Sequence, residues 1–181
     1  MDRFDLQLLT QNWIVDEPDE GMDLCSHGRV LIRFNDLVIS DESYGDWTVA
    51  SSALRLMKSA VYGYDSRTEL EMIPHCGYLR LYPSCPTYIT WDTEVHDNQV
   101  LISNIQTSAN DGKGVKITRG SFIIDRRAYV DQILLFAREV RDFYHRSLPR
   151  KLEDSYDEEE YELFWKEFNE YHRILSGKQT E

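Results

Sequence analysis

The sequence places metal-ligand side chains in two short clusters, Cys25 with His27 and His75 with Cys76, and a third cysteine follows at Cys85. Zinc takes four thiolate or imidazole ligands in a tetrahedron, so Cys25, His27, His75 and Cys76 could together hold one ion. The spacing differs from that of zinc knuckles, because no two cysteines are separated by two residues and no two histidines by three. We therefore predict no resident metal and keep a metal-stabilised domain or metalloenzyme at this cluster as an alternative.

A cysteine nucleophile is a weaker interpretation of the same residues. Cys25 lies two residues from Asp23, whose negative charge disfavours the reactive thiolate. The sequence also lacks a Gly-x-Ser-x-Gly elbow or any other motif that poises a nucleophile beside its base. Cysteine is often an ordinary buried residue, and Gly28 and Gly77 suit turns above buried thiols. We expect no catalytic residues and a protein that is not an enzyme.

The glycine-rich stretch at residues 111–114 does not match a phosphate-binding loop. It lacks the P-loop spacing and no helical segment follows it, so a flexible hairpin loop is the better interpretation. The acidic runs Asp16–Glu20 and Glu153–Glu162 could attract Ca²⁺, but neither has the EF-hand rhythm with glycine at its sixth position. We therefore predict no cofactor.

The charge balance is the most unusual property of the chain. Its 181 residues include 32 acids and 20 bases, which gives a formal net charge of −12 and a pI near 4.8. Such a charge repels nucleic-acid phosphates and anionic membranes and attracts basic proteins. The length suits one domain over residues 1–181, and no apolar run of about 18 residues is present for a membrane span.

The first residues and the cysteine count predict where the protein is found. The opening sequence MDRFD lacks the basic start and the apolar core of a signal peptide. An odd number of cysteines, three, is typical of reduced thiols in a reducing compartment. We expect a cytoplasmic protein that binds neither nucleic acid nor membrane.

The first half of the sequence predicts short strands and one internal helix. Its strand-like runs are Asn12–Val15, Arg29–Phe34, Leu37–Ser40 and Tyr78–Tyr82, the second and third forming a hairpin around a two-residue turn. Apolar residues from Ala50 to Val61 repeat every three to four positions, which indicates a helix that ends near Gly63.

The second half predicts more strands and then two long helices. Strand-like runs at Tyr88–Val95, Gln99–Ile105 and Val115–Ile124 precede the helices, and Gly120 interrupts the last run. The helices are expected at residues 126–147, with Asp125 as N-cap, and at residues 157–175, with a Ser155/Glu158 capping box. Residues 176–181 are expected to be a disordered tail. This order predicts an α+β fold: a largely antiparallel sheet with one internal helix and two long C-terminal helices.

Two acidic stretches are the predicted contact points for a basic partner. They comprise Asp16, Glu17, Asp19 and Glu20 in a Pro/Gly-containing loop, and Asp157, Glu158, Glu159 and Glu160 at the start of the last helix. The helix macrodipole explains part of the second group, because acids in a first turn are favourable there. Trp165, beside Phe164 on the same helix, is included as an aromatic anchor for the partner. Arginines along the 126–147 helix are expected to pair internally with the acidic helix.

Four stretches share a familiar pattern: residues 23–30 (DLCSHGRV), residues 47–54 (WTVASSAL), residues 73–77 (IPHCG), and a C-terminal stretch made of 136–151 and 161–167. Together they resemble a group of small acidic bacterial proteins of unassigned activity, over about residues 13 to 170 of this chain. The group is associated with immunity proteins of polymorphic toxin systems. The resemblance implies a role in toxin immunity and carries no catalytic residues with it.

The expected function follows from the charge and the resemblance. We expect a non-catalytic, immunity-like protein that neutralises a cognate basic toxin domain. Toxic nucleases are basic because they bind phosphate backbones, and an acidic partner associates with them rapidly. The alternatives are the metal-stabilised domain described above and an acidic mimic of nucleic acid.

Overall fold

The computed structural model describes residues 1–14, 20–80, 85–109 and 114–177 of the chain. Within these ranges the protein has an α+β fold with antiparallel sheets, as the sequence predicts. The helices are α1 (Val49–Tyr62), α2 (Arg126–Arg146) and α3 (Ser155–Leu175). The strands are β1 (Phe4–Leu8), β2 (His27–Gly28), β3 (Val30–Phe34), β4 (Leu37–Ser40), β5 (Trp47–Thr48), β6 (Ile73–Pro74), β7 (Tyr88–Val95), β8 (Gln99–Ser108), β9 (Val115–Thr118) and β10 (Phe122–Asp125).

A three-stranded antiparallel sheet contains the N-terminus and has the order β1-β3-β4. The β3–β4 hairpin confirms the predicted one, and Asn35 adopts a left-handed φ of 52° in its turn. The strand expected at Asn12–Val15 is wrong in its described part, because Asn12 forms only an isolated bridge to His27. The sequence-based expectation also misses β1, which pairs with β3 along its whole length.

A second sheet has the order β10-β8-β7-β6, with β9 also paired to β8. The β7–β8 pair confirms the predicted hairpin, and Gly120, at φ = 111°, separates β9 from β10 as expected. The strand expected at Tyr78–Tyr82 is wrong in its described part, because residues 78–80 are irregular. A parallel bridge between Asp2 and Ile124 joins this sheet to the start of β1.

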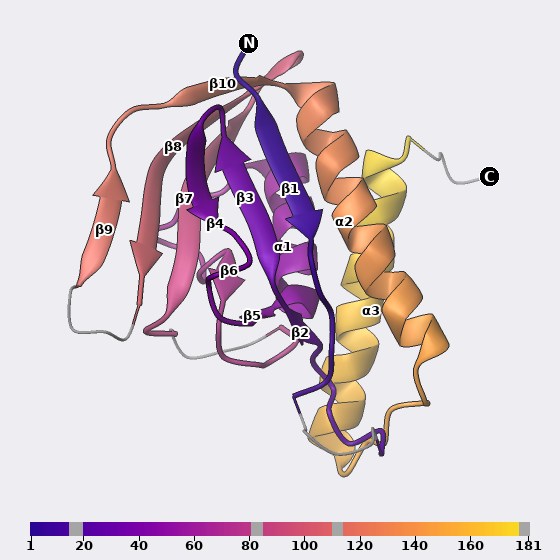
Figure 1. Cartoon of the computed structure of the whole chain (residues 1–181). Coiled ribbons are helices and arrows are strands. Elements are labelled where there is room, and N and C mark those ends of the chain that lie inside the picture. Colours follow the sequence, from indigo (N-terminus) through magenta and orange to yellow (C-terminus); the bar gives the residue numbers. More distant parts are fainter. Residues whose placement is uncertain (15–19, 81–84, 110–113, 178–181) are drawn as a thin grey trace.

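The helices form two layers over the sheets (Figure 1). α1 packs against β6 and β7, and α2 packs across β1, while α3 packs mainly on α1 and α2. Eleven of the fourteen α1 residues are buried, whereas α3 fully buries only Phe164 and Phe168. α1 is therefore the central helix and α3 the outer one. No described helix has the length and apolar character that a membrane crossing requires.

The helix ends follow local hydrogen bonding. Asp125 caps α2 as predicted, its carboxylate accepting the N–H of Ala128 at 2.9 Å. The Ser155 capping box is wrong, since Asp154 is the N-cap of α3. At the other end, the N–H of Ser176 donates to the carbonyl of His172, so residues 176 and 177 close the helix. The rest of the expected tail, residues 178–181, lies outside the described residues.

An aromatic core joins the two sheets to α2. The Phe4 ring lies 5.1 Å from Phe34 of β3 and 5.0 Å from Tyr129 of α2, and Phe34 lies 5.7 Å from Trp91 of β7. These rings are almost completely buried. Stacked, tilted and edge-to-face ring contacts of this kind add stability beyond that of the buried apolar area.

Candidate functional site: an acidic–aromatic hollow

Three segments that are distant in the sequence meet around a hollow of about 290 Å³ at the start of α3. Residues 22–25 form one wall, residues 77–79 form the second, and the first turns of α3 form the third. We call this the acidic–aromatic hollow. Its lining residues are Met22, Asp23, Leu24, Cys25, Gly77, Tyr78, Leu79, Tyr156, Asp157 and Glu160.

The α3 wall carries acids because a helix begins there. The Asp154 carboxylate accepts the N–H groups of Tyr156 and Asp157, both at 2.9 Å, and so fixes the first turn. Acids that follow the cap complement the positive end of the helix dipole. Glu158 and Glu159 are exposed, and neither takes part in an ion pair with another residue that the structure describes. Their charge is therefore available to a partner.

The 22–25 wall is tied to α2 and to the connection that follows it. The N–H of Lys151 donates to the carbonyl of Gly21 at 2.7 Å. The Tyr144 hydroxyl of α2 donates to the carbonyl of Leu24 at 2.9 Å. These two bonds hold the wall beside the segment that leads into α3.

Arg80 fastens the 77–79 wall to α3. Its guanidinium forms ion pairs with Glu160 at 3.0 Å and with Glu167 at 3.1 Å. From the opposite side, the Ser51 hydroxyl of α1 donates to the carbonyl of Tyr78. The expected pairing of α2 arginines with α3 acids is not found among the described ion pairs, in which Arg80 supplies the positive charge instead.

The surface around the hollow has the composition of a binding site. Met22, Tyr78 and Tyr156 are 43%, 53% and 54% exposed, respectively. Met and Tyr are enriched in protein interfaces, and the carboxylate of Asp157 lines the same hollow. Burial raises the pKa of the Cys25 thiol to about 12, so this lining residue is a neutral thiol at neutral pH. The arrangement therefore suits noncovalent binding and gives Cys25 no role as a nucleophile.

Apart from the exposed Glu158 and Glu159 described above, the predicted acids fall into three groups. Asp157 and Glu160 line the hollow, although Glu160 is compensated by Arg80 and its side chain is only 13% exposed. Glu20 is exposed and lies two residues before Met22 of the first wall. The other predicted residues of the acidic loop, Asp16, Glu17 and Asp19, lie outside the described residues.

Trp165 lies inside an aromatic cluster and not at the hollow. Its half-buried ring lies 5.0 Å from the rings of Tyr144 and Phe164 and 5.2 Å from that of Phe168. It therefore packs between α2 and α3, and we do not retain it as the aromatic anchor of the surface.

Sequence reasoning misses the three exposed apolar residues of the hollow. One signal was available: Tyr156 lies off the apolar stripe of its helix, which begins at Tyr161. Met22 and Tyr78 each follow a glycine in an irregular segment, and no local pattern shows that these two segments meet.

The candidate zinc ligands do not converge. Among the residues that the structure describes, no group of three or more His, Cys, Asp and Glu side chains is placed to hold a metal ion. The Cys76 Sγ lies 3.0 Å from the Cys85 Sγ, His75 is exposed, and His27 and Cys25 are buried. The geometry therefore gives no support to the metal-site alternative.

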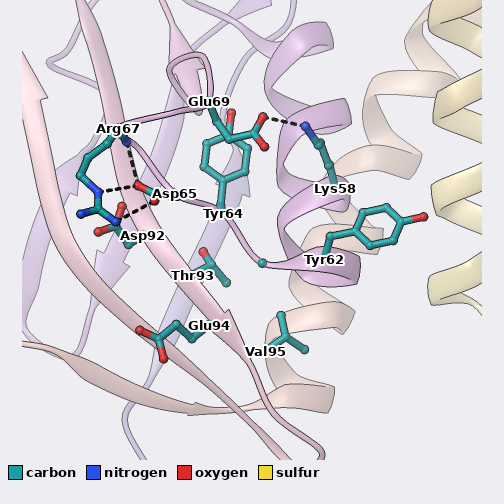
Figure 2. A pocket seen from close by; sticks show the side chains of 11 residues that line it. Lys58, Tyr62, Tyr64, Asp65, Arg67, Glu69, Asp92, Thr93, Glu94 and Val95 are labelled. Atoms are coloured by element: carbon teal, nitrogen blue, oxygen red, sulfur yellow. Dashed lines mark hydrogen bonds and ion pairs between the residues drawn. The ribbon is translucent and has the colours of Figure 1, made fainter.

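Another hollow, of about 440 Å³, lies at the end of α1 against β7 (Figure 2). Its charges are largely paired with one another: Arg67 donates to both Asp65 oxygens at 2.9 and 2.8 Å, and Lys58 lies 2.6 Å from Glu69. The hydrogen bonds from Arg67 lower the pKa of Asp65 to about 2, so this acid is ionised at neutral pH.

A third hollow of about 640 Å³, between the start of α2 and the end of α3, also mixes both signs of charge. Neither combines carboxylates with two exposed aromatic residues, as the acidic–aromatic hollow does with Tyr78 and Tyr156.

His27 lies beneath the 77–79 wall and predicts a pH-dependent stability. It is 3% exposed, neither ring nitrogen has a hydrogen-bond partner among the described residues, and a Cβ at Gly77 would lie 2.8 Å from its Nε2. Burial lowers its pKa below the ordinary 6.5, while the charge of Asp23 opposes that shift. As the pH falls, His27 is therefore protonated in the unfolded chain before it is protonated in the folded protein. The free energy of unfolding consequently decreases as the pH drops below 6.5.

We expect the free energy of unfolding to fall between pH 7.5 and 5.5 by up to about 1.4 kcal/mol more in the wild type than in His27→Gln. Urea denaturation at both pH values measures the difference, and the shared carboxylates cancel in the comparison. Equal losses in the two proteins would show that His27 does not couple folding to protonation.

The comparisons with known proteins assign no function to this surface. Protein-family models, curated proteins and solved structures were each compared with the chain, and none matches it. The function proposed below therefore rests on the charge, the exposed side chains and the geometry of the chain itself.

Proposed function

We propose that this chain is a non-catalytic binding protein that neutralises a basic protein partner, as an immunity protein covers a cognate toxin domain. The observation that carries the proposal is the acidic–aromatic hollow, where exposed Met22, Tyr78 and Tyr156 stand beside the acids of α3. The net charge of −12 extends the same preference to the whole molecule.

The two kinds of side chain contribute differently to binding. Tyrosine and methionine provide contact area that is desolvated when a partner docks, and residues of this kind carry most of the affinity of an interface. Exposed carboxylates such as Glu158 and Glu159 steer a basic partner to the surface and raise the association rate. The hollow therefore supports both tight and fast binding, as blocking a toxin requires.

The class of partner follows from the same charge. A domain that cleaves nucleic acid must present cationic side chains to phosphates, and those side chains are what an acidic inhibitor can cover. The resemblance to small acidic bacterial proteins points the same way. In this proposal the protein acts in the cytoplasm, where such a toxin would reach its substrate.

Affinity capture with the tagged full-length chain from its native host tests the proposal. We expect one basic protein to be retained in stoichiometric amount at low salt and released progressively as salt rises. The charge-reversal variant Glu158→Lys/Glu159→Lys should lower the association rate about tenfold, because steering is lost.

The matched control reverses two exposed acids elsewhere, Glu94→Lys and Asp97→Lys, with the same change in net charge. These residues lie near the start of α2, whereas α3 begins after the end of α2. If both variants slow association equally, only bulk charge matters and the hollow is not the site. Retention of many unrelated basic proteins, or of none, would contradict the proposal.

A further inference from the structure

Two thiols face each other at the base of the loop between β6 and β7. Cys76 follows β6 and Cys85 precedes β7, and their Sγ atoms lie 3.0 Å apart. The backbone N–H of Cys76 also points to the Cys85 Sγ, at 3.4 Å. The N–H of His75 donates to the Thr87 carbonyl at 3.0 Å, so the ladder between the two strands continues up to the thiols and holds them together.

We propose that Cys76 and Cys85 are a modification site: an oxidisable dithiol that hydrogen peroxide converts to an intramolecular disulfide. The Sγ atoms must approach by about 1 Å, because a disulfide bond is about 2 Å long. The strand ladder already supplies the remaining proximity. Disulfides in a reducing compartment are usually transient and redox-sensing, which fits two reduced thiols whose sulfur atoms are 3.0 Å apart.

The reaction begins at Cys76, because it is half-buried while Cys85 is 1% exposed. The Cys76 thiolate attacks one oxygen of the peroxide, the O–O bond breaks, and hydroxide leaves with a sulfenic acid on Cys76. The Cys85 sulfur then attacks the Cys76 sulfur, the S–O bond breaks, and the Cys85 proton leaves with that oxygen as water. In total, two thiols and one peroxide give one disulfide and two waters.

Cys25 is an internal control for this pair. Its Sγ lies 3.7 Å from the Ser51 hydroxyl, whereas the Cys76 and Cys85 sulfur atoms lie 3.0 Å from each other. Burial also raises the pKa of its thiol to about 12, so it has almost no thiolate to react. Of the three thiols, one should therefore survive oxidation.

The disulfide would close the loop that carries the second wall of the acidic–aromatic hollow. Residues 77–80 lie inside the closed ring, including exposed Tyr78 and the Arg80 that pairs with α3. Oxidation should therefore stabilise the folded protein, including this wall, because the disulfide lowers the conformational entropy of the unfolded chain. The inference does not depend on the proposed function, because the disulfide is measured on the isolated chain.

Peptide mapping of the peroxide-treated full-length chain tests the inference. We expect the loss of two alkylatable thiols and of two hydrogen atoms in mass, both reversed by dithiothreitol. Trypsin cleaves after Arg80, between the two cysteines, so the disulfide should join two peptides that reduction separates. The oxidised chain should also have a higher urea midpoint than the reduced chain.

Two variants complete the test. Cys25→Ser should form the disulfide as the wild type does, and Cys76→Ser should not and should show no oxidative rise in the urea midpoint. The wild-type map alone decides the matter even where a variant fails to fold. Oxidation of Cys76 to sulfinic or sulfonic acid without a cross-link, or only disulfides between chains, would overturn the inference.

Discussion

Replacing Tyr78 and Tyr156 together by alanine is expected to weaken binding of the captured partner about 100-fold, which corresponds to about 2.7 kcal/mol. Both rings line the acidic–aromatic hollow and are more than half exposed, so they are the largest apolar surfaces there that a partner can desolvate. Fold stability should change little, because an exposed ring contributes little to the core. Titration calorimetry with the partner, together with urea denaturation of the free variant, measures both quantities.

The matched control for this pair is Tyr62→Ala. Tyr62 is 65% exposed and is the last residue of α1, whereas Ser51, which bonds to Tyr78, lies near the start of that helix. Among the described aromatic pairs, Tyr62 contacts only the Tyr171 ring. Its replacement should leave the dissociation constant within twofold. An unchanged dissociation constant for Tyr78→Ala/Tyr156→Ala would remove the hollow from the interface, whatever the effect of the acids.

The substitution Phe34→Ala is expected to destabilise the fold by about 3–5 kcal/mol, in the range of large aromatic truncations in cores. Phe34 is fully buried and contacts rings from three other strands: Phe4 and Phe122 at 5.1 Å each and Trp91 at 5.7 Å. Removing it leaves a cavity where the two sheets meet. A stability of this size is a large part of what a small domain has, so much of the variant should be unfolded at physiological temperature.

Urea denaturation followed by tryptophan fluorescence measures this loss. Val38→Ala on the adjacent strand is the control, because Val38 is 45% exposed and its loss should cost less than about 1 kcal/mol. Similar losses in the two variants would show that the ring cluster does not join the sheets energetically.

The fold could be predicted wherever a local pattern determined it. The stripe of Tyr129, Ile133, Phe136 and Val140 predicts the buried face of α2, and the Asp125 cap predicts its start. The turn at Asn35 sets the β3–β4 hairpin in the same way. Periodicity and capping are local properties, so sequence alone determines them.

Strand β1 is not predicted from the sequence because it contains a buried charged residue, Asp5. Phe4, Leu6 and Leu8 alternate with polar residues, which is a strand pattern, but Asp5 would normally indicate an exposed face. In the structure Asp5 is 8% exposed and its carboxylate pairs with Arg33 of the neighbouring strand at 2.7 Å. Arg3 also pairs with Asp5, at 2.9 Å, but the pairing with Arg33 spans 28 residues and cannot be found from a local pattern.

The site was predictable only in its charged part. The acids at the start of α3 belong to one helical turn and can be found in the sequence, while the ion pair between Glu160 and Arg80 depends on a tertiary contact. The exposed apolar residues of the hollow also depend on tertiary structure, because Met22, Tyr78 and Tyr156 come from three segments that only the fold brings together.

The link between Asp2 and Ile123 has a consequence for how the protein is made. The two residues exchange hydrogen bonds of 2.7 Å across 121 positions of sequence, so the first strand cannot be locked to the second sheet until about two thirds of the chain has left the ribosome. The third wall of the hollow, at Tyr156, is synthesised later still. A chain that ends before residue 156 therefore lacks the third wall, so the acidic–aromatic hollow can form only after most of the described fold has been synthesised.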